Sequence, residues 1–129
     1  MKLRYEYLGD NIELDEFFKT LMFQKIMDSG FSQAERDMLL VVLRQTIHYN
    51  KWSDRISVHR LSQLVGVGTA KLRQTIKQLE AKGLLEIQQS KGGRTESALR
   101  FSKFSLSNEL ISIVAKYWLE IKWENGFEK

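Results

Sequence analysis

The fold is decided by the stretch SVHRLSQLVGVGTAKLRQTIKQLEAKGLL, residues 57–85 of this 129-residue chain. Two runs of apolar residues at the helical period flank a tight turn, Val65-Gly66-Val67-Gly68. The apolar positions are Val58, Leu61, Leu64 and Val65 before the turn, and Leu72, Ile76 and Leu79 after it. Gly66 takes a positive φ at little steric cost, so the first helix can end abruptly there. The stretch is therefore predicted to be a helix-turn-helix.

The outward face of the second helix, residues 69–82, is the informative one. Arg, Lys and Gln side chains suit phosphates and base edges in a DNA major groove. An ordinary solvated face is the alternative, because surface helices are usually rich in Lys and Gln. No carboxylate precedes Glu80 on this helix. The outward positions are Ala70, Arg73, Gln74, Lys77 and Ala81, with Lys71 and Gln78 at their edge.

Positive charge is concentrated around this motif. Residues 60–103 carry nine Lys and Arg against three Asp and Glu, whereas residues 1–59 and 104–129 are each net −1. The whole chain has a net charge of +4. Such a localised basic region is expected of a nucleic-acid-binding face. A basic surface also suits anionic membranes, but no long basic amphipathic helix supports that alternative.

The composition excludes several classes of protein. An apolar fraction of 43% with seven Phe, four Tyr and three Trp indicates a folded domain. The absence of Cys excludes disulfides, thiolate metal sites and a Cys nucleophile, and the absence of Pro suits a helix-rich chain. No apolar run approaches the roughly 20 residues of a membrane span. The N-terminus lacks the apolar core of a signal peptide, so we expect a cytoplasmic protein.

The residues before the motif predict a short extended arm and two helices. Residues 1–11 alternate as a strand that pairs with the small sheet or packs against a partner. Residues 13–29 form a helix whose apolar stripe includes Phe17, Phe18, Leu21, Met22 and Ile26, with Gly30 as its stop.

A second helix, from Ser32 to about Tyr49, is expected to be the most buried of the domain. Ser32 and Glu35 have the spacing of a capping box at its start, and Asn50 is its expected terminator. A minimal strand at residues 55–56 then leads to Ser57, which is the expected N-cap of the first motif helix.

After the motif, the hydrophobic period changes from helix to strand. Gly83 is the expected C′ residue, residues 85–88 alternate, and a glycine-rich basic loop at 90–94 precedes a return strand ending near Leu106. Such a hairpin is a wing, with Lys91 and Arg94 on its loop and Arg100 and Lys103 on its return strand. The paired glycines permit close approach of a DNA phosphate or minor groove, and a flexible tip with solvating charges is the alternative.

Ser107 is the expected N-cap of a final helix, residues 108–124, that is rich in aromatic residues. It either packs on the N-terminal helix or forms a two-fold interface. The predicted fold class is mostly α (α+β): a winged helix-turn-helix with a small β-hairpin wing and extra N- and C-terminal helices. Residues 1–129 are expected to form one domain, with an arm and helix at 1–30, the winged-helix core at 32–106 and the last helix at 107–129.

Two motifs in this region resemble known families. Residues 61–67 and 72–85 resemble the bacterial winged helix-turn-helix pattern, in which the helix after the glycine carries the DNA contacts. Residues 43–57, LRQTIHYNKWSDRIS, are similar to the N-terminal DNA-binding domain of phage replication protein O. The resemblance covers roughly residues 32–86. Gly68 and Thr69 stand where related sequences usually have a capping Ser or Thr and then a basic residue.

The resemblance implies duplex DNA as the partner and a role in replication initiation. Initiators of this kind also carry a downstream portion that recruits the replicative helicase. This chain ends soon after the winged helix, so either that portion is missing or the chain has a different role on DNA. Replication proteins are therefore a second expected class of partner, with a homodimer through the last helix as an open alternative.

No catalytic arrangement is evident. His48 and His59 have no second ligand at metal-binding spacing, and the wing lacks the phosphate-loop pattern. We therefore expect no enzyme activity, cofactor or metal. The expected function is sequence-specific binding of duplex DNA, as a replication initiator or a transcriptional regulator. A protein-interaction module that uses the last helix is the alternative. The candidate DNA-binding residues are Arg60, Thr69, Ala70, Lys71, Arg73, Gln74, Lys77, Lys91 and Arg94.

Overall fold

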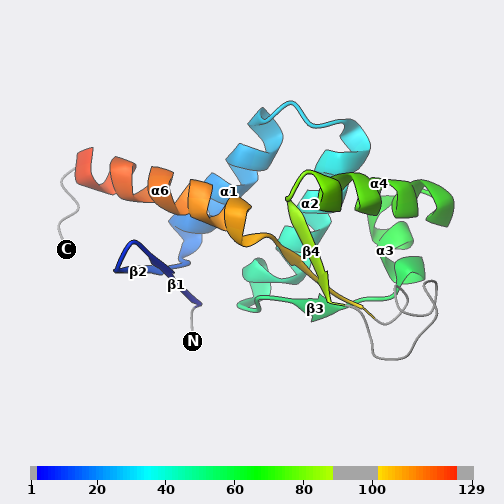
Figure 1. Cartoon of the computed structure of the whole chain (residues 1–129), viewed down its shortest axis with the longest axis horizontal. Helices are drawn as coiled ribbons and strands as arrows, with labels where there is room; N and C mark the ends of the chain where they lie inside the picture. The colour runs from blue at the N-terminus through cyan, green and yellow to red at the C-terminus, as the bar shows by residue number, and fades with distance from the viewer. Residues whose placement is uncertain (1–2, 89–101, 125–129) are drawn as a thin grey trace.

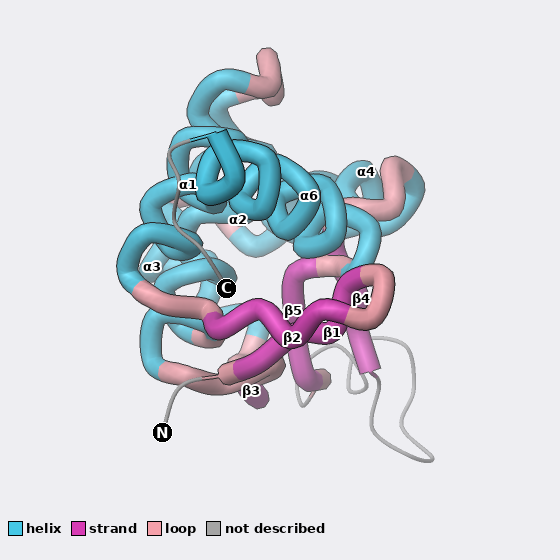
Figure 2. The backbone as a smooth tube through the Cα atoms, turned by 90° about the vertical axis from the view of Figure 1, so that its left-hand side faces the viewer, coloured by secondary structure: helices cyan, strands magenta, loops and turns pink. Residues whose placement is uncertain are grey.

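The computed structural model describes residues 3–88 and 102–124. These residues form several helices and two small antiparallel sheets (Figures 1 and 2). The structure confirms the α+β winged helix-turn-helix fold class. The N-terminal part comprises β1 (Arg4–Tyr7), β2 (Asp10–Glu13), α1 (Glu16–Asp28), α2 (Gln33–Gln45) and a 3₁₀ turn, η1 (Ile47–Tyr49). The remainder comprises β3 (Asp54–Arg55), α3 (Val58–Val65), α4 (Thr69–Ala81), β4 (Leu85–Gln88), β5 (Lys103–Leu106) and α6 (Asn108–Glu124).

The helix starts are set by side-chain caps, because the first N–H groups of a helix have no partner inside it. Ser32 accepts from the Glu35 N–H at 3.2 Å, and the Glu35 carboxylate accepts from the Ser32 N–H at 3.1 Å. This confirms the capping box. Ser57 caps α3 by accepting from the Arg60 N–H at 3.0 Å, and Ser107 caps α6 by accepting from the Leu110 N–H at 3.1 Å. These three caps agree with the sequence-based predictions.

Two helix boundaries differ from those predictions. The first helix begins at Glu16 rather than at residue 13, because the Asp15 side chain accepts from the Phe18 N–H at 2.8 Å and caps it there. The second helix ends at Gln45, and the chain continues as the 3₁₀ turn η1 instead of a continuous helix to Tyr49. Thr46 ends α2, with its hydroxyl donating to the Val42 carbonyl at 2.6 Å. Asn50 then adopts the left-handed conformation as the terminator, as expected.

The strands form two separate sheets. β1 and β2 pair with each other, from Arg4 opposite Glu13 to Tyr7 opposite Asp10. Of the two alternatives for residues 1–11, pairing with the small sheet is therefore wrong. The winged-helix sheet has the order β3-β5-β4, with β5 in the centre and both pairings antiparallel.

The core lies between the helices and the inner face of this three-stranded sheet. α2 contributes Met38, Leu39, Val42 and Leu43, all buried, as expected of the most central helix. One residue of the expected α1 stripe is not in the core, because Phe17 is 37% exposed. Other buried apolar side chains are Phe18, Leu21, Met22, Ile26, Ile47, Leu61, Leu72, Ile76, Leu79, Phe104 and Leu106.

The last helix packs on the first, which confirms the intramolecular alternative for α6 (Figure 1). Its inner face buries Leu110, Val114 and Trp118. Lys122 Nζ lies 4.2 Å from the centre of the Trp118 ring and 4.0 Å from the Asp15 carboxylate at the start of α1. The cation–π contact lies within α6, and the contact between Lys122 and Asp15 joins α6 to the start of α1.

Two glycines have the positive φ that the sequence predicts. Gly66 ends α3 with φ +86°, and Gly83 follows α4 with φ +73°. A Cβ at Gly83 would lie 2.9 Å from a carboxylate oxygen of Glu109. Within residues 3–88 and 102–124, no helix is both long and apolar enough to cross a membrane.

Candidate nucleic-acid interface

The helix after the glycine turn, α4, is held by one buried face. Leu72, Thr75, Ile76 and Leu79 are buried, and the helix contacts α2, α3 and β4. The Thr75 hydroxyl donates to the Lys71 carbonyl at 2.9 Å, which lets a polar residue occupy this apolar face. Because three elements hold one side of α4, its opposite side projects from the molecule.

The projecting side of α4 carries the side chains that the helical period placed there. Gln74 and Lys77 are exposed near its middle, and Ala70 and Lys71 are exposed in its first turn. Thr69 is half-buried, and so is Arg73, which therefore presents less of its side chain than expected. Glu80 is exposed near the C-terminal end. This surface is called the α4 face below and comprises Thr69, Ala70, Lys71, Arg73, Gln74 and Lys77.

The start of α4 has no capping side chain. Gly68 is the N-cap in an extended conformation, and neither it nor Thr69 provides a side-chain hydrogen bond there. Thr69 does not cap the helix, because it is already the first helical residue. The positive end of the helix dipole consequently carries no capping side chain.

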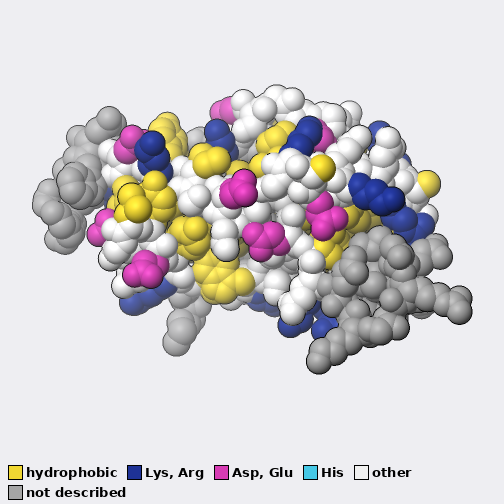
Figure 3. All heavy atoms as spheres, viewed as in Figure 1, with side chains coloured by type: hydrophobic (Ala, Val, Ile, Leu, Met, Phe, Trp, Pro, Cys, Tyr) yellow, Lys and Arg dark blue, Asp and Glu magenta, His cyan; other side chains and the backbone are white. Residues whose placement is uncertain are grey.

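Arg60 lies on the neighbouring helix α3. The Arg60 backbone N–H donates to the Ser57 hydroxyl, and Arg60 is exposed. Gln63, one turn further along α3, is exposed as well. Lys and Arg side chains gather over the α3–α4 end of the molecule in the space-filling view (Figure 3).

The wing is described only at its base. Gln88 pairs with Lys103 at the end of β4 and β5, and Lys103 is half-buried. Three of the expected wing cations, Lys91, Arg94 and Arg100, lie outside the residues that the structure describes.

An ion pair between the buried Glu35 and the half-exposed Lys82, which no sequence pattern indicates, lies at the far end of α4. Lys82 Nζ lies 2.6 Å from Glu35 Oε2, and Glu35 is only 4% exposed. This hydrogen bond from Lys82 is the main cause that lowers the pKa of Glu35 below its usual value, against the opposing effect of burial. Glu35 therefore joins the start of α2 to the end of α4. The capping-box spacing identified Glu35, but its second partner is 47 residues away.

The two histidines are exposed at separate places, on η1 and on α3. Among the residues the structure describes, no three His, Cys, Asp or Glu side chains gather closely enough to hold a metal ion.

The three-stranded sheet, the glycine turn and the projecting α4 define a winged helix-turn-helix protein. Residues 16–101 match the family described as bacteriophage replication protein O, and the chain belongs to this family. The match extends beyond residues 32–86 and includes α1. The description of this family names phage replication.

Three solved structures have a similar fold at low sequence identity. A MarR-family transcriptional regulator from Silicibacter pomeroyi is 15% identical with a TM-score of 0.48, and the match covers 84% of this chain and 64% of that one. Bordetella bronchiseptica BpsR, whose DNA binding is described as regulated by 6-hydroxynicotinic acid, is 18% identical with a TM-score of 0.45, covering 84% and 75%. A possible transcriptional regulator from Methanosarcina mazei Go1 is 10% identical with a TM-score of 0.45, covering 97% and 95%. No curated protein matches the chain.

Proposed function

We propose that this protein binds duplex DNA in a sequence-specific manner, with α4 entering the major groove. The observation that carries the proposal is the contrast between the two sides of α4. One side is buried against the core, and the other exposes Lys71, Gln74 and Lys77 ahead of the first carboxylate at Glu80. A helix of this kind fits the major groove, where amides and cations read base edges and bind phosphates.

The residues of the α4 face have different parts in this proposal. Gln74 and Lys77 reach bases or phosphates from the exposed middle of the helix. Arg73 lies beside them and is half-buried, so its head group reaches the DNA only from the edge of the face. Thr69, Ala70 and Lys71 lie at the groove-facing N-terminal end, where small side chains let the backbone approach the DNA.

Residues outside α4 extend the proposed contact along the phosphate backbone. Arg60 on α3 adds a phosphate contact, because it is exposed on the neighbouring motif helix. Lys91 and Arg94 are assigned to the flanking backbone or minor groove from their place in the sequence alone.

The first experiment selects bound sites from a random pool of duplex DNA and then measures affinity for the selected site at several salt concentrations. Lys77→Ala should lower the slope of log K against log salt by about 0.9, because each phosphate contact releases a counterion. Gln74→Ala should cost about 1–3 kcal/mol on the selected site and little on random DNA if Gln74 reads a base.

Arg44→Ala is the matched control, because Arg44 is exposed as well but lies on α2, beside the groove between α1 and α2. It should leave the salt slope unchanged. Equal losses for Lys77→Ala and Arg44→Ala would contradict the assignment of α4 as the DNA-reading helix. The absence of any selected sequence would contradict sequence specificity.

We further propose a role as a replication initiator or as a regulator of transcription. Family membership favours replication. Binding to tandem repeats together with capture of a helicase loader supports replication, whereas a footprint on a palindrome upstream of a gene supports regulation.

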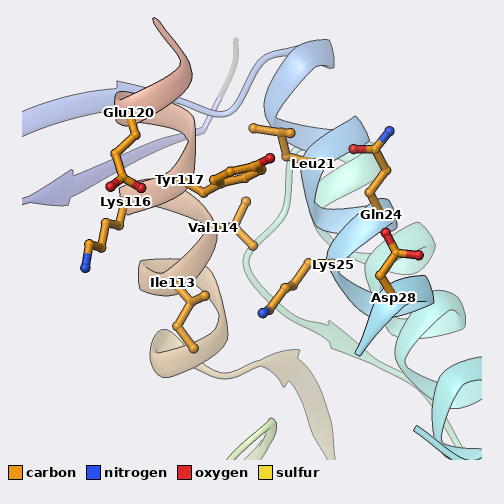
Figure 4. A pocket seen from close by; sticks show the side chains of 9 residues that line it. All are labelled: Leu21, Gln24, Lys25, Asp28, Ile113, Val114, Lys116, Tyr117 and Glu120. Atoms are coloured by element: carbon orange, nitrogen blue, oxygen red, sulfur yellow. The ribbon is translucent and has the colours of Figure 1, made fainter. Parts of the chain in front are cut away.

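A second surface favours a homodimer as a further assembly. A groove of about 430 Å³ lies between α1 and α6, with Ile113 49% and Tyr117 54% exposed. Tyr117 and Lys25 point into this space, whereas Lys116 points away from it (Figure 4). Each helix contributes one cation and one carboxylate to the rim, Lys25 with Asp28 and Lys116 with Glu120. Mixed charges of this kind can pair with a second copy across a two-fold axis. The same surface would serve a winged-helix module that binds another protein instead of DNA.

A further inference from the structure

The outer face of the winged-helix sheet forms a third candidate binding surface, separate from the α4 face and from the groove between α1 and α6. Directly paired residues of an antiparallel sheet point to the same face. Phe104 and Leu106 face the core, so their neighbours Lys103 and Ser105 face outward. The register places Gln88 and Arg55 beside Lys103, and Glu86 beside Ser105.

A groove of about 390 Å³ runs over this outer face. Its floor is the β4–β5 pair, and one wall is Trp52 in the loop that leads into β3. Trp52 is 38% exposed, so its indole ring is not part of the hydrophobic core. The lining residues are Trp52, Ser53, Glu86, Ile87, Gln88, Lys103 and Ser105.

The Trp52 side chain is held in place by the N-terminal hairpin. The Tyr5 ring lies 6.1 Å from the Trp52 ring at 53°, and the Tyr5 hydroxyl lies 3.4 Å from the Asn108 carbonyl at the start of α6. Tyr5 therefore links the indole to two distant parts of the chain. An exposed aromatic ring supported in this way loses little conformational entropy when a flat ligand stacks on it.

The described residues around the groove carry a small excess of positive charge. Asp54 lies 3.4 Å from Lys51 Nζ. Lys103, which lines the groove, and Arg55, the next residue in the same row of the sheet, then stand against one further carboxylate, Glu86, which accepts from the Asn108 N–H at 3.0 Å and keeps its charge. Gln88 and Ser105 supply neutral donors and acceptors for a base edge.

We propose that this groove binds single-stranded DNA, with one unstacked base against Trp52 and the backbone phosphates along Lys103 and Arg55. Aromatic rings combined with a cationic track are the means by which proteins bind single strands, because every base has a face that stacks. A duplex keeps its bases stacked inside, so it offers nothing to the indole. The site goes beyond the duplex interface and does not depend on the α4 face.

The test measures binding of a labelled single strand of about 15 thymidines, and of an abasic strand of the same length, by fluorescence anisotropy. The intact strand should bind at least about fivefold more tightly than the abasic strand, which has the phosphates without the bases. Trp52→Ala should remove this difference, and Trp52→Phe should keep most of it because a ring remains. Lys103→Gln should lower the salt slope by about 0.7.

Phe23→Ala is the matched control, since it removes an aromatic ring that is 48% exposed on α1 and belongs to neither proposed interface. It should bind the thymidine strand as the wild type does. Trp52→Ala should also bind the selected duplex normally. Equal binding of the intact and abasic strands overturns the proposal, and so does an equal effect of Trp52→Ala and Phe23→Ala.

The two DNA proposals fail separately in this design. Binding of thymidine strands that depends on Trp52, without duplex binding, supports this groove and contradicts the α4 interface. Duplex binding that depends on Lys77, without single-strand binding, does the reverse. Tighter binding of an RNA strand of the same length would overturn the assignment to DNA.

Discussion

Glu35 has two structural roles at once. It completes the capping box of α2, and it pairs with Lys82 at the end of α4 while almost fully buried. A carboxylate at this position needs both partners, because a buried charge without a partner costs more than the pair gains. The first role follows from local spacing, whereas the second depends on how α2 and α4 pack.

Glu35→Gln tests the charged part of this arrangement, since Gln still fits a capping box. We expect a loss of about 1–2 kcal/mol in unfolding free energy at pH 7, discounted for the half-exposed Lys82. The pKa of Glu35 is lowered in the folded state from its ordinary 4.5. Its stabilising contribution is therefore complete above pH 4.5 and is lost as the pH falls through the lower folded value.

Urea unfolding of the wild type and the variant should accordingly show a difference that shrinks as the pH is lowered below 4.5. Glu6→Gln, at an exposed position on β1, is the control and should change little. A difference between Glu35→Gln and the wild type that stays constant into acid would show that the charge of Glu35 does not contribute.

At the scale of single elements, the two helices of the helix-turn-helix differ in how well their ends are capped. The C-terminus of α3 has a favourable glycine cap, whereas the N-terminus of α4 has no capping side chain. Gly66 ends α3 in the left-handed conformation, which L-residues rarely adopt. Gly68 starts α4 in an extended conformation without a capping side chain. A Cβ added at either glycine meets nothing within 4 Å. The two positions therefore differ in backbone conformation and not in available space.

Gly68→Ser should stabilise the protein by a few tenths of a kcal/mol, because the hydroxyl can accept from a free N–H of the first turn. Gly66→Ser is the matched variant and should destabilise it by roughly 1 kcal/mol, because φ there is +86°. Thermal unfolding of both variants measures the contrast. Equal shifts in the unfolding midpoint would contradict the prediction, because they would show that a capping side chain at the start of α4 does not stabilise the protein.

The element boundaries show where local reasoning succeeds. Ser32, Ser57 and Ser107 cap the helices that the sequence assigned to them. The predicted start of the first helix, at residue 13, is too early. Residues 13–15 are all compatible with a helix, and only the observed Asp15 cap sets the start at Glu16. No glycine or proline marks the change from α2 to η1, so the sequence does not predict it.

At the scale of the whole molecule, α1 and α6 lie together and leave a groove between them that both charged and apolar residues line. The proposed homodimer predicts that the wild type elutes as a dimer in size-exclusion chromatography with light scattering. Tyr117→Asp should shift it to a monomer, because a carboxylate replaces the aromatic ring at the centre of the contact. The double swap Lys116→Glu with Glu120→Lys should preserve the dimer.

Phe23→Asp is the control for this prediction. Phe23 is 48% exposed on α1, which forms one side of the proposed dimer groove. Its side chain, however, lines the separate groove between α1 and α2. A dimer lost in both variants would indicate unfolding or a different interface. A monomeric wild type would contradict the homodimer.

The sequence by itself determined the helix-turn-helix, its glycine turn, the buried stripe of α4 and the composition of the opposite face. These features follow from local rules, namely the helical period, capping and the conformational freedom of glycine. The tertiary structure alone decided the Lys82–Glu35 pair, the separate N-terminal hairpin and the partial burial of Arg73. It alone also placed Trp52 over the outer face of the sheet. The reason is physical: these arrangements join residues far apart in the chain, and no local pattern records which distant surfaces pack together.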